Sequence, residues 1–216
     1  MDEKLNIISL NKKAWNNVAE KYAKANYTTL NPLIDFFCNN LPKKGLILDL
    51  GSGTGLPFAK LFIEKGFNVL GVDISSQMIK IAQKNVPLAN FKELSMTDLD
   101  YNKKFNGVFS SYSMLLLSPQ LFKDVANRIV KSLKNNGLLY LSLNEPRVEG
   151  EDVDKEVIVD IMGEKMYSRA YREEEILTIF SPLGMKPLKI HHEIHTSKEF
   201  GIEHMIAFVF KKLIYI

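Results

Sequence analysis

The stretch ILDLGSGTGLP, residues 47–57, decides how this chain folds. Its first four residues are apolar except for Asp49, which is typical of a central parallel strand that is covered on both faces. Gly51, Gly53 and Gly55 follow at alternate positions, and glycine permits the positive φ angles and the close ligand approach that a sharp turn needs. The stretch therefore predicts a strand, a glycine turn and a helix at the edge where α/β sheets bind ligands.

Strand-like and helix-like segments alternate outward from this stretch. Helical spacing of apolar residues and capping signals predict helices at 11–25, 31–41, 57–65, 77–84, 121–133 and 173–180. Short apolar runs predict strands at 46–50, 68–72, 91–94, 107–110, 138–143, 165–171, 186–194 and 204–212. The alternation predicts an α/β fold with a doubly wound, mostly parallel sheet and helices on both faces, because right-handed crossovers cover both sides.

Two details extend this prediction. The last two strands are joined by a loop too short for a crossover helix, so they are expected to pair as an antiparallel hairpin. Gly137 is expected to end the helix that precedes the strand 138–143.

Length and composition indicate one domain. The 216 residues are enough for one sizeable core, so we expect a single domain over 1–216, with an N-terminal helical lid at 1–44. The acidic, weakly periodic region 146–171 is expected to form a cap or hairpin insertion.

Charge and apolar runs limit the function classes. The net charge is +3 and basic residues are interleaved with acidic ones, so no stripe for a polyanion is evident and nucleic acid is not indicated. The single cysteine, Cys38, excludes an internal disulfide. No apolar run is long enough for a membrane span, so we expect a cytoplasmic protein with no membrane partner.

Asp73 is the second feature that carries chemistry. It closes the predicted second strand 22 residues after Gly51, where a carboxylate accepts hydrogen bonds from both ribose hydroxyls of a bound nucleoside. The alternative is that Asp73 caps a helix beginning at Ser75 or Ser76. A dinucleotide-binding turn would carry its third glycine at position 56, where this chain has Leu56, so the register points away from NAD.

Taken together, these residues resemble the class I S-adenosylmethionine-dependent methyltransferases, of the small-molecule type. The resemblance covers about residues 45–145 and rests on ILDLGSGTG, GVDIS at 71–75, FKELSMTDLD at 91–100, KKFNGVFSSYSMLLL at 103–117 and KSLKNNGLLYLSL at 131–143. It implies a seven-stranded Rossmann-like sheet in the order 3-2-1-4-5-7-6, with the last strand antiparallel. It also implies S-adenosylmethionine as the methyl donor and S-adenosylhomocysteine as the product.

The resemblance also implies a set of cofactor-binding residues. These are Tyr22, Asp49, Gly51, Ser52, Gly53, Gly55, Asp73, Ile74, Met78, Met96, Thr97, Asp98, Ser110 and Ser111. The glycine turn would line the methionine moiety, the strand-end Asp the ribose, and the residues at 74, 78 and 96–98 the adenine. The two serines would lie beside the methionyl ammonium, and the lid tyrosine, with Trp15 near it, would reach the carboxylate. The alternatives are a turn role for the Asp at 98 and core packing for the two methionines.

No catalytic base is carried over by the resemblance. Asn106 stands where an Asp is common, and Leu115 and Leu116 stand where many relatives carry His. An acceptor that arrives protonated needs a base, for which the candidates are Tyr112, Glu145 and Tyr171.

A histidine-rich segment needs separate treatment. His191, His192 and His195 are close in sequence, but neighbours on a strand face opposite sides, so no metal site is expected.

The function expected from the sequence is methyl transfer to a small-molecule acceptor by in-line displacement. Two alternatives stay open: a non-catalytic S-adenosylmethionine-binding protein, and an NAD-binding oxidoreductase. The acceptor, the methylated atom and the oligomeric state are not specified by these motifs.

Overall fold

A computed structural model describes residues 3–25, 31–148, 150–154, 157–197 and 201–214. Its helices are α1 (Glu3–Lys24), α2 (Pro32–Asn39), α3 (Phe58–Glu64), α4 (Ser76–Asn85), α5 (Pro119–Ser132) and α6 (Glu173–Phe180). Its strands are β1 (Leu46–Leu50), β2 (Asn68–Asp73), β3 (Asn90–Glu93), β4 (Phe105–Ser111), β5 (Leu133–Asn144), β6 (Ile158–Ile161), β7 (Glu164–Tyr167), β8 (Met185–Ser197) and β9 (Gly201–Lys212). Three short 3₁₀ turns are η1 (Met96–Asp98), η2 (Met114–Leu116) and η3 (Ser181–Leu183).

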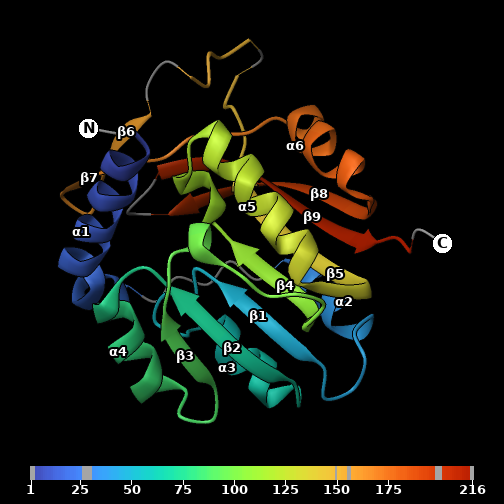
Figure 1. Ribbon diagram of the computed structural model, residues 1–216. Coiled ribbons are helices and arrows are strands. Elements are labelled where there is room, and N and C mark those ends of the chain that lie inside the picture. The colour runs from blue at the N-terminus through green and yellow to red at the C-terminus, as the bar shows by residue number, and fades with distance from the viewer. Residues whose placement is uncertain (1–2, 26–30, 149, 155–156, 198–200, 215–216) are drawn as a thin grey trace.

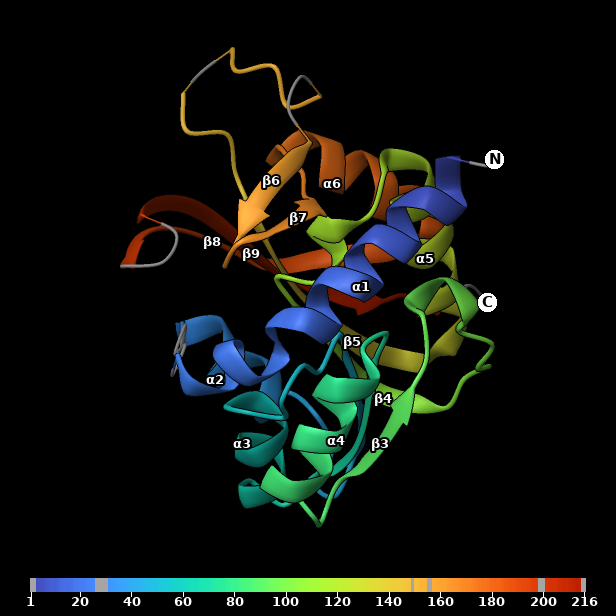
Figure 2. The same cartoon turned by 90° about the vertical axis from the view of Figure 1, so that its left-hand side faces the viewer.

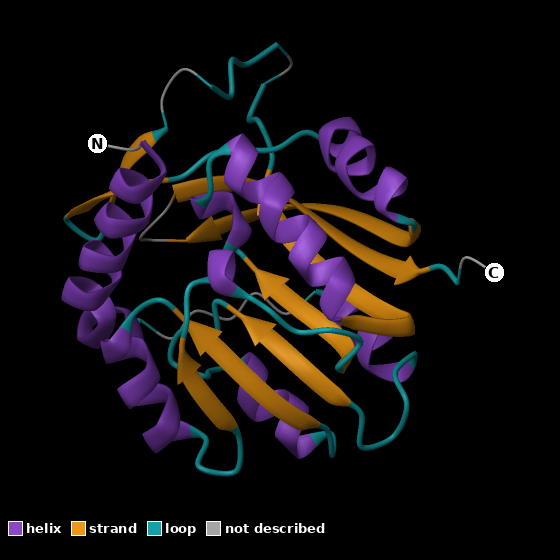
Figure 3. Ribbon diagram, in the orientation of Figure 1, coloured by secondary structure: helices purple, strands orange, loops and turns teal. Residues whose placement is uncertain are grey.

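The centre of the molecule is a seven-stranded sheet in the order β3-β2-β1-β4-β5-β9-β8 (Figure 1; Figure 3). Strands β1 to β5 are parallel, and β9 runs antiparallel to both β5 and β8. The fold class is confirmed. The expected order was 3-2-1-4-5-7-6. The strands expected as 6 and 7 are β8 and β9 here, because β6 and β7 form a separate two-stranded sheet before them.

Apolar layers lie on both faces of the sheet, which is why its central strands are mostly apolar. On one face α5 and α6 pack against residues such as Leu50 and Leu139. On the other face α2 and α3 pack around Phe109 and Tyr140, whose rings are stacked with centroids 4.3 Å apart. The N-cap of α2 joins this layer, because the Asn31 side chain donates a 2.7 Å hydrogen bond to the Tyr140 hydroxyl.

Two expectations about boundaries are wrong. The strand expected at 165–171 ends at Tyr167, because the chain beyond it turns toward α6. Gly137 does not end α5, which stops at Ser132 and passes directly into β5. The glycine is required by a register shift between β4 and β5, where a Cβ atom would lie 2.9 Å from the Lys134 carbonyl oxygen.

Helix α1 crosses the carboxyl ends of the parallel strands, between the β6–β7 hairpin and α4 (Figure 2). Asn11 attaches it to the hairpin, since its side chain accepts from the Tyr167 N–H at 2.8 Å and donates to the Leu116 carbonyl. Asn16 attaches it to α4, because its oxygen accepts from the Ser75 hydroxyl at 2.8 Å. The helix is therefore fixed as a cover over the edge where the glycine turn lies.

Within the part of the chain that the structure describes, every helix is too short or too polar to cross a membrane.

Candidate functional site

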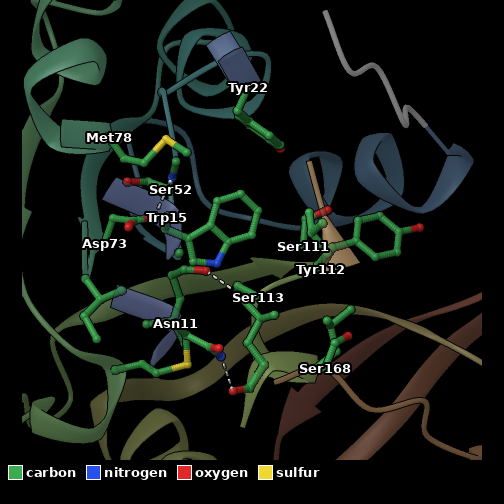
Figure 4. A pocket seen from close by; sticks show the side chains of 18 of the residues that line it. Asn11, Trp15, Tyr22, Ser52, Asp73, Met78, Ser111, Tyr112, Ser113 and Ser168 are labelled. Carbon is green, nitrogen blue, oxygen red and sulfur yellow. Dashed lines mark hydrogen bonds between the residues drawn. The ribbon is translucent and has the colours of Figure 1, made fainter. Parts of the chain in front are cut away.

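A cavity of about 440 Å³ lies at the carboxyl ends of β1, β2 and β4. The glycine turn, the strand ends, α1 and β6 all contribute to its lining. Figure 4 shows side chains from several of these elements, among them Asp73 and Ser52 close to Trp15. Trp15 and Tyr22 reach it from α1, and their rings meet edge to face with centroids 5.5 Å apart. The edge predicted to bind a ligand is therefore hollow and covered.

The glycine turn forms the floor of this cavity. Gly51 and Gly53 have φ angles of 73° and 52°, which residues other than glycine rarely adopt. The N–H groups of Gly51 and Ser52 donate to the Val72 carbonyl at 2.8 and 3.0 Å, so the turn is fastened to the end of β2. A Cβ atom on Gly53 would lie 3.9 Å from the Tyr22 ring, which places the lid tyrosine directly over the turn.

Asp73 joins the glycine turn to the start of α4. One carboxylate oxygen accepts from the Gly53 N–H at 2.9 Å and the other from the Ser75 N–H at 2.8 Å. The helix itself is capped by the Ser75 hydroxyl, which accepts from the Met78 N–H. The Ile74 N–H is a third backbone donor to this carboxylate. Since the two oxygens of a carboxylate offer about four acceptor sites, Asp73 keeps acceptor capacity for a ligand hydroxyl. Burial raises the pKa of Asp73 to about 6, against the lowering effect of these N–H donors.

Asp49 is the second buried carboxylate. Its side chain is 3% exposed, and no residue in the described part of the chain hydrogen-bonds its Oδ2 atom. Burial, and then the charge of Asp73, raise the pKa of Asp49 to about 7. A buried carboxylate without a partner is costly, so a cation entering the cavity would be stabilised here.

Most of the predicted cofactor residues line the cavity. These are Tyr22, Asp49, Gly51, Ser52, Gly53, Asp73, Ile74, Met78, Met96 and Ser111. Four others do not: Gly55, Thr97, Asp98 and Ser110.

Two of those four residues are used for packing inside the protein. Gly55 has a φ angle of 77°, and a Cβ atom there would lie 3.1 Å from the Phe91 ring, so the glycine allows the turn to pack against β3. Ser110 is fully buried, and its hydroxyl lies 2.8 Å from that of Ser113. It is Ser113 that lines the cavity in its place.

The other two lie in the turn η1. Thr97 is buried, with its hydroxyl 2.8 Å from that of Ser95, and the Asp98 side chain is exposed to solvent. The Asp98 N–H donates to the Ser95 carbonyl, as expected if Asp98 is a turn residue and not an adenine contact. The structure therefore offers Ser95 and Met96 to the cavity from this turn.

Of the three candidate bases, only Tyr112 lines the cavity. Its hydroxyl donates to the Met205 sulfur at 2.8 Å, and burial raises its pKa further above the ordinary value. Tyr171 is buried outside the cavity, donates to the Leu117 carbonyl at 3.0 Å and also has a raised pKa. Neither phenol is suited to accept a proton at neutral pH.

Glu145, the third candidate, lies on the other side of the sheet. It meets His192 Nδ1 at 2.8 Å, and the Nε2 atom of the same ring meets Glu173 at 2.9 Å. His191 faces the opposite way, toward Glu193. Among the described residues no three His, Cys, Asp or Glu side chains gather in a metal-binding group.

One whole wall of the cavity lies outside the residues that the sequence motifs predict. Asn144, His195, Glu203 and Met205 lie beyond the glycine turn, at the end of β5 and on the β8–β9 hairpin. They come from strands that are distant in sequence, and no local motif marks them. Their alternate spacing on a strand was the one signal available.

Comparison with known proteins gives the same family for the central region. The sequence profile described as "Methyltransferase domain" matches residues 47–137. An uncharacterized methyltransferase of Alkaliphilus oremlandii is 24% identical over 154 residues, which cover 71% of this chain and 67% of that protein. A carboxy-S-adenosyl-L-methionine synthase of Nautilia profundicola is 29% identical over 151 residues, covering 68% of this chain and 64% of the relative. The chain thus spans about two thirds of the length of these two relatives.

A solved structure shows the same fold over nearly the whole chain. The 1,6-didemethyltoxoflavin-N1-methyltransferase of Burkholderia thailandensis, with bound 1,6-didemethyltoxoflavin and S-adenosylhomocysteine, superposes with a TM-score of 0.77. The two share 16% sequence identity, and the match covers 99% of this chain and 92% of that one.

Proposed function

This chain belongs to the class I S-adenosylmethionine-dependent methyltransferases, and we propose that it moves the methyl group of S-adenosylmethionine to a small-molecule acceptor. The observation that carries the proposal is one continuous cavity that is lined both by the glycine turn with Asp73 and by a polar wall from β5, β8 and β9. Such a cavity has room for a donor and an acceptor side by side.

The residues present fit the cofactor. The carboxylate of Asp73 suits ribose hydroxyls. The buried carboxylate of Asp49, whose Oδ2 atom has no hydrogen-bond partner among the described residues, suits the methionyl ammonium. The positive φ angles at Gly51 and Gly53 leave the turn without side chains that would fill the floor. When bound, the sulfonium supplies an activated methyl group.

The chain's own task is to position the acceptor and exclude water. Trp15 and Tyr22 on α1, together with the hairpin residue Ile161, cover the cavity. This cover supports a small acceptor, since a polymer would need an open groove. A Burkholderia protein of the same fold holds a small heterocycle together with S-adenosylhomocysteine. Holding the nucleophile in line with the methyl group provides much of the acceleration.

Two measurements test the proposal. Isothermal titration should show binding of S-adenosylhomocysteine, with NAD in the same cell as the control for an oxidoreductase. Incubation with trideuteromethyl-labelled S-adenosylmethionine and a small-molecule cell extract should then give a product that is heavier by one labelled methyl group. Failure to bind S-adenosylhomocysteine would refute the proposal that this cavity binds the cofactor. Binding without any labelled product identifies a non-catalytic binder.

Cofactor affinity should depend on pH because of the two buried carboxylates. The pKa values of Asp49 and Asp73, about 7 and about 6, lie above the ordinary value, so both groups are partly protonated in the free protein below pH 7. An ammonium and two hydroxyl donors prefer the ionised carboxylates, so binding releases protons. We therefore expect the affinity for S-adenosylhomocysteine to rise between pH 5.5 and 8. Where binding releases one proton, the affinity should rise about tenfold for each pH unit. A Kd independent of pH over this range would contradict the assignment.

A further inference from the structure

The β8–β9 hairpin extends past the end of β5 and carries a polar wall of the cavity. Met205 is paired with Asn144, the last residue of β5, and Glu203 is paired with His195 on β8. Paired residues share a face of the sheet, as do residues two apart on one strand. All four residues therefore face the cavity together, and all four line it.

Two acceptor groups meet on this wall. The Asn144 side chain donates from Nδ2 to Glu203 Oε1 at 3.3 Å, which turns its own carbonyl oxygen, Oδ1, away from that bond. Oδ1 is buried and has no hydrogen-bond partner in the described part of the chain. A buried amide oxygen without a partner costs free energy until a donor arrives. The wall therefore presents the Glu203 carboxylate to whatever binds beside it, and the Asn144 amide holds that carboxylate in place.

The surroundings of Glu203 favour proton acceptance. It is partly buried, and burial raises its pKa above the ordinary range. The Asn144 amide and the charges of His195 and Arg147 act in the opposite direction. Two further groups lie near this wall. The Tyr112 hydroxyl donates a hydrogen bond to the Met205 sulfur, and Glu193 on β8 is the strand-pairing partner of Met205. A carboxylate with a raised pKa is a stronger base than one in water.

From this geometry we propose that Glu203 is the general base for the acceptor and that Asn144 positions it, so that the acceptor is a small molecule with a neutral N–H or O–H nucleophile. This assignment rests on the proposed methyl transfer. In the step, the nucleophile forms a bond to the methyl carbon while the bond from that carbon to the sulfonium sulfur breaks. The proton of the nucleophile passes to Glu203. The products are the methylated acceptor, neutral S-adenosylhomocysteine and a protonated Glu203, so the charge balances.

A pair of probes tests the contact with the N–H group. Protein saturated with S-adenosylhomocysteine is titrated with benzimidazole, which has an N–H donor, and with 1-methylbenzimidazole, which lacks it. We expect benzimidazole to bind the unaltered protein about tenfold more tightly, as the loss of one hydrogen bond to a charged group predicts. In Glu203→Ala this preference should fall below about threefold. Equal affinities in the unaltered protein, or no benzimidazole binding, would overturn the proposal.

Glu193→Ala is the matched control. Glu193 lies on the same face of the same hairpin and contacts His191, but it does not line the cavity, so this variant should keep the preference for benzimidazole. Loss of the preference in both variants would show that hairpin charge, and not contact with Glu203, decides it. The affinity for S-adenosylhomocysteine is measured for each variant first. If the unaltered protein fails to bind it, the proposed function falls; if it binds and only the probe test fails, this inference alone falls.

Turnover provides a second measurement. With the acceptor that the labelled-methyl assay identifies, Glu203→Ala should lower the single-turnover rate about 100-fold, the usual contribution of a general base. The cofactor Kd should stay within about twofold, because Glu203 lies on β9 and is not part of the glycine turn or of the strand end that carries Asp73. An unchanged rate would show that the acceptor loses its proton elsewhere.

Discussion

Replacing Asp73 by alanine should weaken the binding of S-adenosylhomocysteine at least about 100-fold, since hydrogen bonds to a charged group contribute about 1.5 to 3 kcal/mol each. The variant loses the carboxylate that is proposed to accept from the ribose hydroxyls. It also releases the Gly53 and Ser75 N–H groups that now hold the glycine turn against α4. Isothermal titration measures the affinity, and circular dichroism checks that the variant is folded.

Asp98→Ala is the informative control for this variant. Both residues are acidic and follow neighbouring strands, so the sequence motifs assign both to the cofactor. In the structure Asp98 is exposed and outside the cavity, and its replacement should change the cofactor Kd by less than about threefold. A large loss with Asp98→Ala, or a small loss with Asp73→Ala, would show that the cofactor is held differently.

Replacing Gly51 by alanine should lower the free energy of unfolding by about 4 kcal/mol, from backbone strain and overpacking together. The φ angle there is 73°, and a Cβ atom would lie 2.3 Å from Cβ of Ser113. Ser113 cannot move away easily, because its hydroxyl donates to the Leu50 carbonyl at 2.6 Å. Urea unfolding followed by circular dichroism measures the change.

Gly66→Ala separates the two causes of this loss. Gly66 has a comparable φ angle of 85°, but a Cβ atom there would meet nothing within 4 Å. Its replacement should therefore cost only the backbone strain, about 1 to 2 kcal/mol. Equal losses for the two variants would mean that the contact with Ser113 contributes nothing.

The cavity also explains how one chain holds two substrates. The cofactor end is built from the strand ends and turns of the parallel half of the sheet, while the proposed acceptor end is built from β9 and the end of β5. Helix α1 covers both, and Asn11 fixes it to the β6–β7 hairpin and to η2. Changes of acceptor therefore require changes only in the hairpins and the lid, and the cofactor end can stay the same.

The sequence by itself predicted the parallel sheet and the residues at the glycine-turn end of the cavity. The apolar strand before Gly51, the glycine turn and Asp73 are local in sequence, and each residue acts on neighbours within one β–α–β unit. Their geometry is set by backbone rules, because the turn needs positive φ angles and a strand end needs an acceptor. The boundaries of α6 could be predicted from the helical spacing of its apolar residues, whereas the strand order was implied by the resemblance to a known family.

Only the tertiary structure decided which polar residues face the cavity beyond that unit. Ser110 and Ser111 are neighbours at the end of β4, yet the first is fully buried and only the second lines the cavity. Asp98 follows a strand as Asp73 does, but the turn η1 directs it to solvent. Glu203 and Asn144 are 59 residues apart and meet because β9 pairs with β5. Strand pairing and register depend on the packing of the whole core, which no local motif contains.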